Sequence, residues 1–279
     1  MGKVTAARLA ALGHRVLLTA RDQPSADRAA AEIRRAHPRA NVEARAVDLS
    51  SMAAVRAFGQ GLCAEGLVLD VLFHCAGVMQ QSPVRLTTPE GFEQTLAVNA
   101  LAPFLLTHAL LEALRRSAAG RVVNVTSRLH MPGSRGAPVN FDFDDPQLER
   151  GYDPDRAYKN SKLALLWFSY ELHRRLGAGP LTVNAVCPGF VPTTAAESAH
   201  GFQRWLLRHV LAHLPLARSV EQAADAFSFM AVDPSLDKVS GQFYGDKQPL
   251  ASSPESYDEA KAKRFWDLAA AATATGRWP

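Results

Sequence analysis

Short apolar segments rich in β-branched residues alternate with longer helical patterns along most of this sequence. Nearly continuous apolar strands between helices are typical of a parallel sheet that is covered on both faces. The predicted strands span residues 15–19, 42–47, 68–73, 121–125, 182–186 and 242–244. The predicted helices span residues 3–12, 25–36, 52–65, 91–116, 156–176 and 221–232. The sequence therefore predicts a doubly wound parallel α/β sheet, and the lack of repeats or linkers predicts a single domain over residues 1–279.

The composition narrows the classes of protein to which the chain could belong. Of 279 residues, 47% are hydrophobic and 21% are charged, which suits a domain with a full core. The net charge of +4 is spread along the chain, so we expect no nucleic-acid partner. Three scattered cysteines, Cys63, Cys75 and Cys187, favour neither disulfides nor zinc, and we find no apolar run of transmembrane length. We therefore expect a cytoplasmic protein.

Polar, small or glycine residues stand at the carboxyl end of each long predicted strand. Parallel α/β sheets bind their ligands beyond these strand ends. The residues at these ends are Thr19-Ala20-Arg21, Asp48-Leu49, Ala76-Gly77, Thr126-Ser127 and Pro188-Gly189. This pattern predicts a nucleotide lying along one edge of the sheet.

Tyr158 and Lys162 are four residues apart in a predicted helix, so they share one face. An isolated pair of this kind would most simply be a solvated helix face. Here, however, Ser127 ends an apolar strand 31 residues upstream (158 − 127), and Asn99 interrupts an apolar stretch in which a buried amide needs partners. A nearby ammonium favours phenolate, so Tyr158 could act as a general acid–base.

Six motifs make the chain resemble the short-chain dehydrogenase/reductase family along nearly all of its length. They are "DLS" at 48–50, "HCAGV" at 74–78, "VNALAPF" at 98–104, "VVNVTS" at 122–127, "AYKNSK" at 157–162 and "CPGFVPTT" at 187–194. The segment "FDFDDPQLERGYDPDRAYKNSK" further resembles the insert before the catalytic tyrosine in the retinol-dehydrogenase-like branch. The family usually has two asparagines where this chain has His74 and Cys75, and we expect these two residues to pack at the strand end rather than to take part in catalysis.

The resemblance implies a role for each residue of a Ser-Tyr-Lys-Asn site. Tyr158 would exchange a proton with the substrate oxygen, and Lys162 would hold the nicotinamide ribose and lower the Tyr158 pKa. Ser127 would hydrogen-bond the substrate oxygen, and Asn99 would anchor a water molecule. The implied cofactor-binding residues are Gly2, Arg21, Asp48, Leu49, Ala76, Gly77, Pro188, Gly189 and Thr193. Hydride would move between the nicotinamide and the substrate carbon.

Arg21 decides the expected choice of cofactor. The second strand of the family's order ends in "TAR" here, with no Asp or Glu to accept a ribose hydroxyl, whereas an arginine suits a 2′-phosphate. Lys3 could add a second positive charge, although Arg21 could also be an ordinary surface residue. The sequence favours NADP(H) over NAD(H).

The segment 202–213 bears on the substrate. Phe202, Trp205, Leu206 and Val210 share one helical face, which fits a packed helix, an apolar substrate lid or contact with a membrane surface. A lid would imply a lipophilic alcohol, ketone or aldehyde. His209 and His213 have helical spacing, but no third ligand is apparent, so we expect no metal.

The first residues of the chain indicate where it starts within the family's fold. Gly2 aligns with the last glycine of the family's glycine-rich motif, so we expect the first strand and the earlier glycines to be missing from this sequence. We expect an oxidoreductase of a small apolar molecule, forming a homodimer or homotetramer through the helices at 91–116 and 156–176. The alternative is a non-catalytic interaction protein that retains a remnant of the fold.

Overall fold

The computed structural model describes residues 1–134, 136–192, 217–276 and 278. These residues belong to two compact units. The first unit comprises Met1–Leu49 and Phe190–Phe229, and the second comprises Ser50–Gly189 and Met230–Pro279. Each unit is described by itself, and the single domain expected over residues 1–279 stays a prediction.

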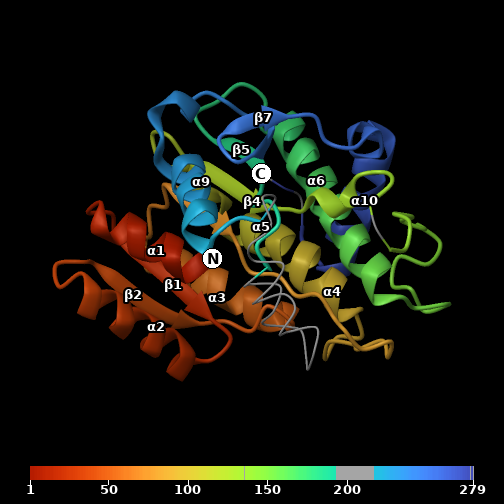
Figure 1. The fold of residues 1–279 in the computed structure, drawn as a ribbon, viewed down its shortest axis with the longest axis horizontal. Coiled ribbons are helices and arrows are strands. Elements are labelled where there is room, and N and C mark those ends of the chain that lie inside the picture. Colours follow the sequence, from red (N-terminus) through yellow and green to blue (C-terminus); the bar gives the residue numbers. More distant parts are fainter. Residues whose placement is uncertain (135, 193–216, 277, 279) are drawn as a thin grey trace. The chain divides into compact units, whose positions relative to one another are not determined.

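The first unit contains a two-stranded parallel sheet and its helices (Figure 1). Strands β1 (Val16–Ala20) and β2 (Val42–Ala46) pair in register. Helix α2 (Gln23–Ala36) begins after Asp22, whose carboxylate accepts a hydrogen bond from the Ser25 amide. Its buried side chains share a core with those of helix α1 and strand β2, made of Ala6, Ala10, Ala30, Ile33 and Val42. Helix α1 (Gly2–Ala11) begins and ends one residue before the helix predicted over residues 3–12.

The second unit contains a five-stranded sheet of order β3-β4-β5-β6-β7. The first four strands are parallel, and the last pair is antiparallel. The strands are β3 (Val71–His74), β4 (Arg121–Val125), β5 (Thr182–Cys187), β6 (Phe243–Gly245) and β7 (Gln248–Leu250). Every residue of β4 and β5 is buried, which explains why both strands are largely apolar, although Arg121, Asn124, Thr182 and Asn184 lie within them.

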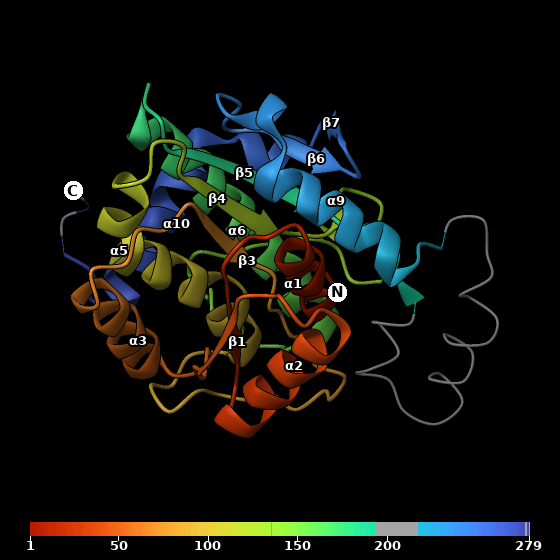
Figure 2. The same cartoon turned by 90° about the vertical axis from the view of Figure 1, so that its left-hand side faces the viewer.

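Helices pack together around this sheet, α3 against α5 and α10 against α6 (Figures 1 and 2). The bounds of the helices of this unit are α3 (Met52–Ala64), α4 (Gln94–Leu96), α5 (Ala102–Arg115), α6 (Pro154–Leu176) and α10 (Glu259–Ala272). Helix α9 (Val220–Val232) belongs mainly to the first unit, which ends at Phe229. A π-helical segment η1 (Ala97–Leu101) joins α4 to α5. Short 3-10 turns η2 (Arg128–His130), η4 (Pro234–Leu236) and η5 (Pro254–Tyr257) complete the unit. The described residues therefore form a Rossmann-like α/β fold with a mainly parallel sheet.

The structure adds to the predicted elements and divides the predicted sheet. Strand β7 and helix α10 were not predicted, and the long helix expected at 91–116 begins at Gln94 and is wound as a π-helix in its second turn. Strands β1 and β3 belong to separate sheets in the described part of the chain, so they do not pair directly. Both sheets keep the parallel order that the apolar strands predict.

The continuous helical segment Gln94–Arg115 is long enough and apolar enough to cross a membrane, with a mean hydropathy of 1.5. No apolar run of this length was predicted from the sequence, because Asn99, Thr107 and His108 interrupt the segment. In the structure 83% of its most apolar window is buried. The segment is therefore a core helix of the second unit.

Candidate active site

Helix α6 presents Tyr158 and Lys162 one turn apart. The helix begins after Asp153, whose carboxylate accepts a hydrogen bond from the Arg156 amide, and this cap fixes where its first turn starts. The Lys162 ammonium lies 5.7 Å from the centre of the Tyr158 ring and donates a hydrogen bond to the Val125 carbonyl at 3.0 Å. The structure thus brings the two side chains together, as their spacing predicts.

Ser127 follows strand β4 and completes a pair with Tyr158. A hydrogen bond between the two hydroxyl groups acts to lower the pKa of Tyr158, but burial has the larger effect and raises that pKa to about 12. The ammonium of Lys162 lies 5.7 Å from the centre of the Tyr158 ring, and its expected effect of lowering the Tyr158 pKa stays a prediction. Tyr158 is a protonated phenol at neutral pH.

Lys162 is buried more completely than Tyr158. Burial disfavours the charged ammonium and lowers the pKa of Lys162 to about 8. Its bond to the Val125 carbonyl fixes the side chain beside the end of β4. Lys162 can therefore gain or lose a proton close to neutral pH.

Asn99 lies in the π-helical segment η1 and holds the chain that follows β3. Its amide group accepts a hydrogen bond from the Val78 amide and donates one to the Val78 carbonyl, both at 2.8 Å. It also donates to Ser161 on α6 at 3.0 Å. Because three hydrogen bonds to Val78 and Ser161 occupy this side chain, it positions Val78 and α6, and its role in anchoring a water molecule stays a prediction.

Small residues follow the ends of β3 and β5, where the resemblance implies that the cofactor approaches the backbone closely. A Cβ atom on Gly77 would lie 3.2 Å from both Asn99 Oδ1 and Lys162 Nζ, so a side chain there would crowd both groups. Ala76 and Gly77 are exposed, as is Gly189, whose φ is 79°, whereas Pro188 is buried. This narrow, partly exposed edge beside Lys162 fits the nicotinamide end of the expected cofactor.

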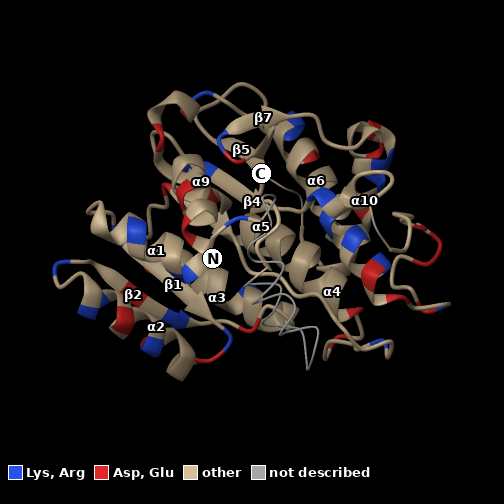
Figure 3. Ribbon diagram, in the orientation of Figure 1, with Lys and Arg blue, Asp and Glu red and all other residues tan. Residues whose placement is uncertain are grey.

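The remaining cofactor candidates lie in the first unit. Arg21 is exposed directly after β1, and Asp48 and Leu49 are partly exposed after β2, two residues beyond its end. Since β1 and β2 are parallel neighbours, these residues share the carboxyl edge of that sheet. Charges of both signs occur along α2 (Figure 3).

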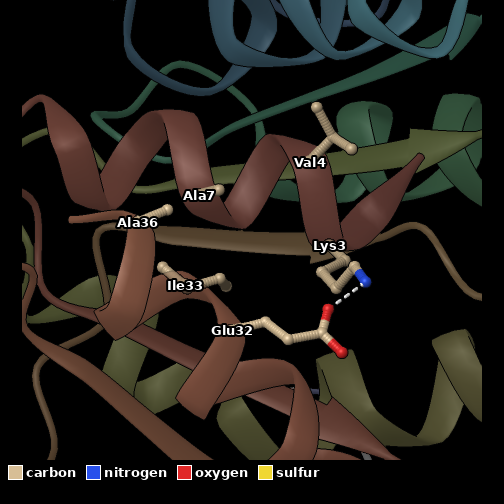
Figure 4. Close-up of a pocket in the computed structure, with 6 residues that line it drawn as sticks. All are labelled: Lys3, Val4, Ala7, Glu32, Ile33 and Ala36. Atoms are coloured by element: carbon tan, nitrogen blue, oxygen red, sulfur yellow. Dashed lines mark hydrogen bonds and ion pairs between the residues drawn. The ribbon is translucent and has the colours of Figure 1, made fainter.

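Lys3, which was offered as a second phosphate ligand, is engaged elsewhere. Its ammonium forms an ion pair with Glu32 on α2 at 2.5 Å, and this contact lowers the pKa of the Glu32 carboxyl. The pair borders a small surface pocket between α1 and α2, otherwise lined by the apolar residues Val4, Ala7, Ile33 and Ala36 (Figure 4). Arg21 is therefore the better candidate for the phosphate.

Two histidines, His74 and His130, are buried near the strand ends, and no sequence motif marks His130. His130 Nδ1 donates to the Ser127 carbonyl, and its Nε2 accepts a hydrogen bond from the Ser253 amide at 3.2 Å. His74 packs at the end of β3, as expected, with Nε2 at 2.8 Å from the Thr107 hydroxyl. Burial lowers the pKa of both rings, so they are neutral structural groups.

Several predicted features fall outside the described residues. These are Thr193, the helical face of Phe202, Trp205, Leu206 and Val210, and the pair His209 and His213. Among the residues that the structure describes, no group of three or more His, Cys, Asp or Glu side chains could hold a metal ion.

Comparisons with known proteins cover almost the whole chain. A family model described as enoyl-(acyl carrier protein) reductase matches residues 1–244. Human retinol dehydrogenase 13 is 36% identical over 271 residues, which are 95% of this chain and 79% of the relative. Human retinol dehydrogenase 12 is also 36% identical, over 96% of this chain and 81% of its own length.

Solved structures give the same result. An uncharacterized protein from Mycobacterium paratuberculosis is 30% identical, with a TM-score of 0.71 over 100% of this chain and 90% of that chain. A metagenomic short-chain oxidoreductase in complex with NADP is 26% identical, with a TM-score of 0.60 over 86% of this chain and 88% of its own. Because the family model spans residues 1–244 and the human relatives are covered over about four fifths of their length, the chain belongs to the short-chain dehydrogenase/reductase family of oxidoreductases.

Proposed function

We propose that this chain is an NADP(H)-preferring dehydrogenase/reductase acting on a lipophilic alcohol, ketone or aldehyde. The observation that carries the proposal is the contact of the Ser127 hydroxyl with the Tyr158 phenol, beside the buried ammonium of Lys162. This arrangement presents two hydroxyl groups to one substrate oxygen and keeps a titratable amine next to them.

The residues of the site have distinct chemical tasks in this proposal. When bound, the nicotinamide cofactor supplies or accepts the hydride. For a carbonyl substrate, Tyr158 gives its proton to the oxygen while Ser127 donates a hydrogen bond to the same atom. The raised pKa of Tyr158 keeps that proton in place at neutral pH. In the reverse direction Tyr158 takes the proton of the alcohol, and Lys162, with a pKa of about 8, lies close enough to stabilise the phenolate.

The preference for NADP(H) rests on Arg21. Its exposed guanidinium stands directly after β1, where a carboxylate would be needed to bind an unphosphorylated ribose. The metagenomic relative in complex with NADP supports this assignment.

The substrate class follows from the relatives. Several are retinol dehydrogenases at about 35% identity, and retinol is a lipophilic primary alcohol. We extend this class, rather than one molecule, to the present chain. We also propose a cytoplasmic location, in which the thiols of Cys63, Cys75 and Cys187 would stay reduced.

Replacing Tyr158 by phenylalanine tests the proposal. We expect Tyr158→Phe to lower kcat by about 10²–10⁴-fold with retinaldehyde as substrate, since only the proton-transferring hydroxyl is removed. The affinity for NADPH, measured by fluorescence titration, should stay within about twofold of the wild-type value.

Tyr257→Phe is the matched control, because Tyr257 is 50% exposed and its hydroxyl contacts Ser252 rather than Ser127. It should keep wild-type turnover. A Tyr158→Phe protein with a near-normal kcat would overturn the assigned mechanism. A wild-type chain that neither binds NADPH nor turns over lipophilic aldehydes would instead favour the non-catalytic interaction protein.

A further inference from the structure

Lys159, the residue after Tyr158, is fully buried, with 0% of its surface exposed. A buried ammonium is costly unless it is paired and hydrogen-bonded. Its Nζ donates a hydrogen bond to the Ala137 carbonyl at 2.6 Å. The same atom lies 3.0 Å from a carboxylate oxygen of Asp155, one helical turn earlier, as an ion pair rather than an aligned hydrogen bond. The charge is thus satisfied by a loop segment and by the first turn of α6.

Asn160 fastens the same loop segment to the helix. Its side-chain amide donates to the Asn140 carbonyl at 2.7 Å and accepts from the Asn140 amide at 3.1 Å. The two residues that follow Tyr158 therefore hold both ends of the short stretch 137–140. We call these contacts of Lys159 and Asn160 the clamp.

Gly136 gives an independent sign that this stretch must lie close to α6. Its φ is 83°, a conformation that side chains rarely adopt. A Cβ atom on Gly136 would lie 2.2 Å from Asp155 Oδ2, the carboxylate oxygen that faces Lys159. The close approach at the clamp thus depends on the absence of a side chain at position 136.

The other end of the loop is fixed at Ser127. The His130 ring holds the Ser127 carbonyl, and the Ser134 hydroxyl donates to the Leu129 carbonyl at 2.9 Å. The chain that leaves Ser127 therefore returns to α6 next to Tyr158. It is held at one end by the contact of His130 with Ser127 and at the other by the clamp, which follows Tyr158. Ser127 and Tyr158 carry the two hydroxyl groups proposed to bind the substrate oxygen.

We propose that Lys159 is a positioning residue, whose clamp holds residues 136–140 as a wall of the substrate site. This inference rests on the proposed function. A loosened wall would weaken binding of the substrate, whose oxygen lies between Ser127 and Tyr158. The affinity for NADPH would change little, because the clamp contacts none of the proposed cofactor-binding residues.

The test uses Lys159→Met, which keeps the length of the side chain and removes its charge. We expect KM for retinaldehyde to rise about tenfold while kcat changes less than about threefold, since a displaced wall affects substrate positioning first. Amide hydrogen exchange, followed by mass spectrometry, should become faster in residues 136–141 than in the wild-type chain. Lys159→Arg should recover part of both effects.

Two further variants keep the test decisive. Gly136→Ala leaves the Lys159 side chain intact and places a methyl group against Asp155, and it should give the same rise in KM and the same faster exchange. Lys263→Met, at an exposed position on α10, controls for loss of one positive charge and should change neither.

The outcomes separate the clamp from the proposed function. Unchanged exchange in residues 136–141 of Lys159→Met and Gly136→Ala, or a fall in kcat at constant KM, would overturn the inference. A wild-type chain without turnover would contradict the proposed function, and faster exchange in the variants would still support the clamp.

Discussion

Lys162 and His74 are ionisable side chains held in the interior of the second unit. Each is a base whose pKa is lowered because burial disfavours its charged form, to about 8 for Lys162 and to about 3 for His74. Tyr158 is an acid, so burial moves its pKa in the opposite direction. One physical cause thus gives a neutral histidine, a titratable lysine and a protonated tyrosine within one site.

At the scale of single residues, Arg21 is the side chain expected to select NADP(H) over NAD(H). We expect Arg21→Asp to reverse the preference for NADP(H), because a carboxylate repels a 2′-phosphate and can accept a hydrogen bond from a free ribose hydroxyl. The ratio of kcat/KM for the two cofactors should shift toward NAD(H) by about 10²-fold or more, since discrimination of a charged group is worth several kcal/mol. Steady-state kinetics with both cofactors measures this ratio.

Arg35→Asp is the control for the Arg21 experiment. Arg35 lies in the last turn of α2, away from the carboxyl end of β1, so its replacement removes the same charge without facing the cofactor. The control should leave the ratio unchanged. If Arg21→Asp also leaves the ratio unchanged, Arg21 does not contact the phosphate.

His74 carries a prediction about acid stability. The unfolded chain binds a proton at this ring below a pH of about 6.5, whereas the folded chain resists protonation until the pH approaches its lowered pKa of about 3. The free energy of unfolding therefore falls as the pH drops through this window, by up to about 1.4 kcal/mol per pH unit. Urea denaturation between pH 7 and pH 4 measures the slope.

His74→Asn should make that slope shallower, because an asparagine cannot take up the proton and can still hydrogen-bond Thr107. His14→Asn, at an exposed position before β1, should leave the slope as it is. Equal slopes for the wild-type chain and His74→Asn would mean that other groups cause the acid sensitivity.

At the scale of secondary-structure elements, the close packing of α3 against α5 depends on a single small residue. Gly59 on α3 is buried, and a Cβ atom there would lie 2.5 Å from Ala109 Cβ on α5. We expect Gly59→Ala to destabilise the protein by about 1–3 kcal/mol, since the two helices would have to separate. Chemical denaturation at constant pH measures the loss.

Gly61 offers a control within the same helix. A Cβ atom on Gly61 would meet nothing within 4 Å, so Gly61→Ala should stabilise the protein by up to about 1 kcal/mol through helix propensity alone. If both variants change stability in the same direction, propensity rather than the contact with Ala109 governs α3.

Helix α10 decides which surface of the second unit is available to a partner. Phe265 and Trp266 on α10 pack against aromatic side chains of α6. The ring centroids of Trp266 and Phe168 are 6.0 Å apart, and those of Phe265 and Trp167 are 6.3 Å apart. The residues of α6 from Lys159 to Leu172 are buried. The homodimer that the family resemblance suggests through this helix stays a prediction.

The sequence by itself determined the strands and the identity of the candidate site. Five of the predicted strands lie within one residue of β1, β2, β4, β5 and β6 at each end, because short, mainly apolar segments between helical patterns mark the strands of such a sheet. The period of the α-helix placed Tyr158 and Lys162 on one face, and the end of an apolar run placed Ser127 at the carboxyl edge of the sheet. These are local relations, so the order of residues was sufficient to predict them.

Only the tertiary structure decided how these residues are held. His130 joins Ser127 to Ser253, which is 123 residues away along the chain, and no local pattern marks such a contact. The clamp of Lys159 and the raised pKa of Tyr158 arise in the same way, from burial by segments distant in the sequence. Burial and long-range hydrogen bonds depend on which elements pack against one another in the tertiary structure. Local sequence patterns predict the elements themselves, but not which of them come into contact.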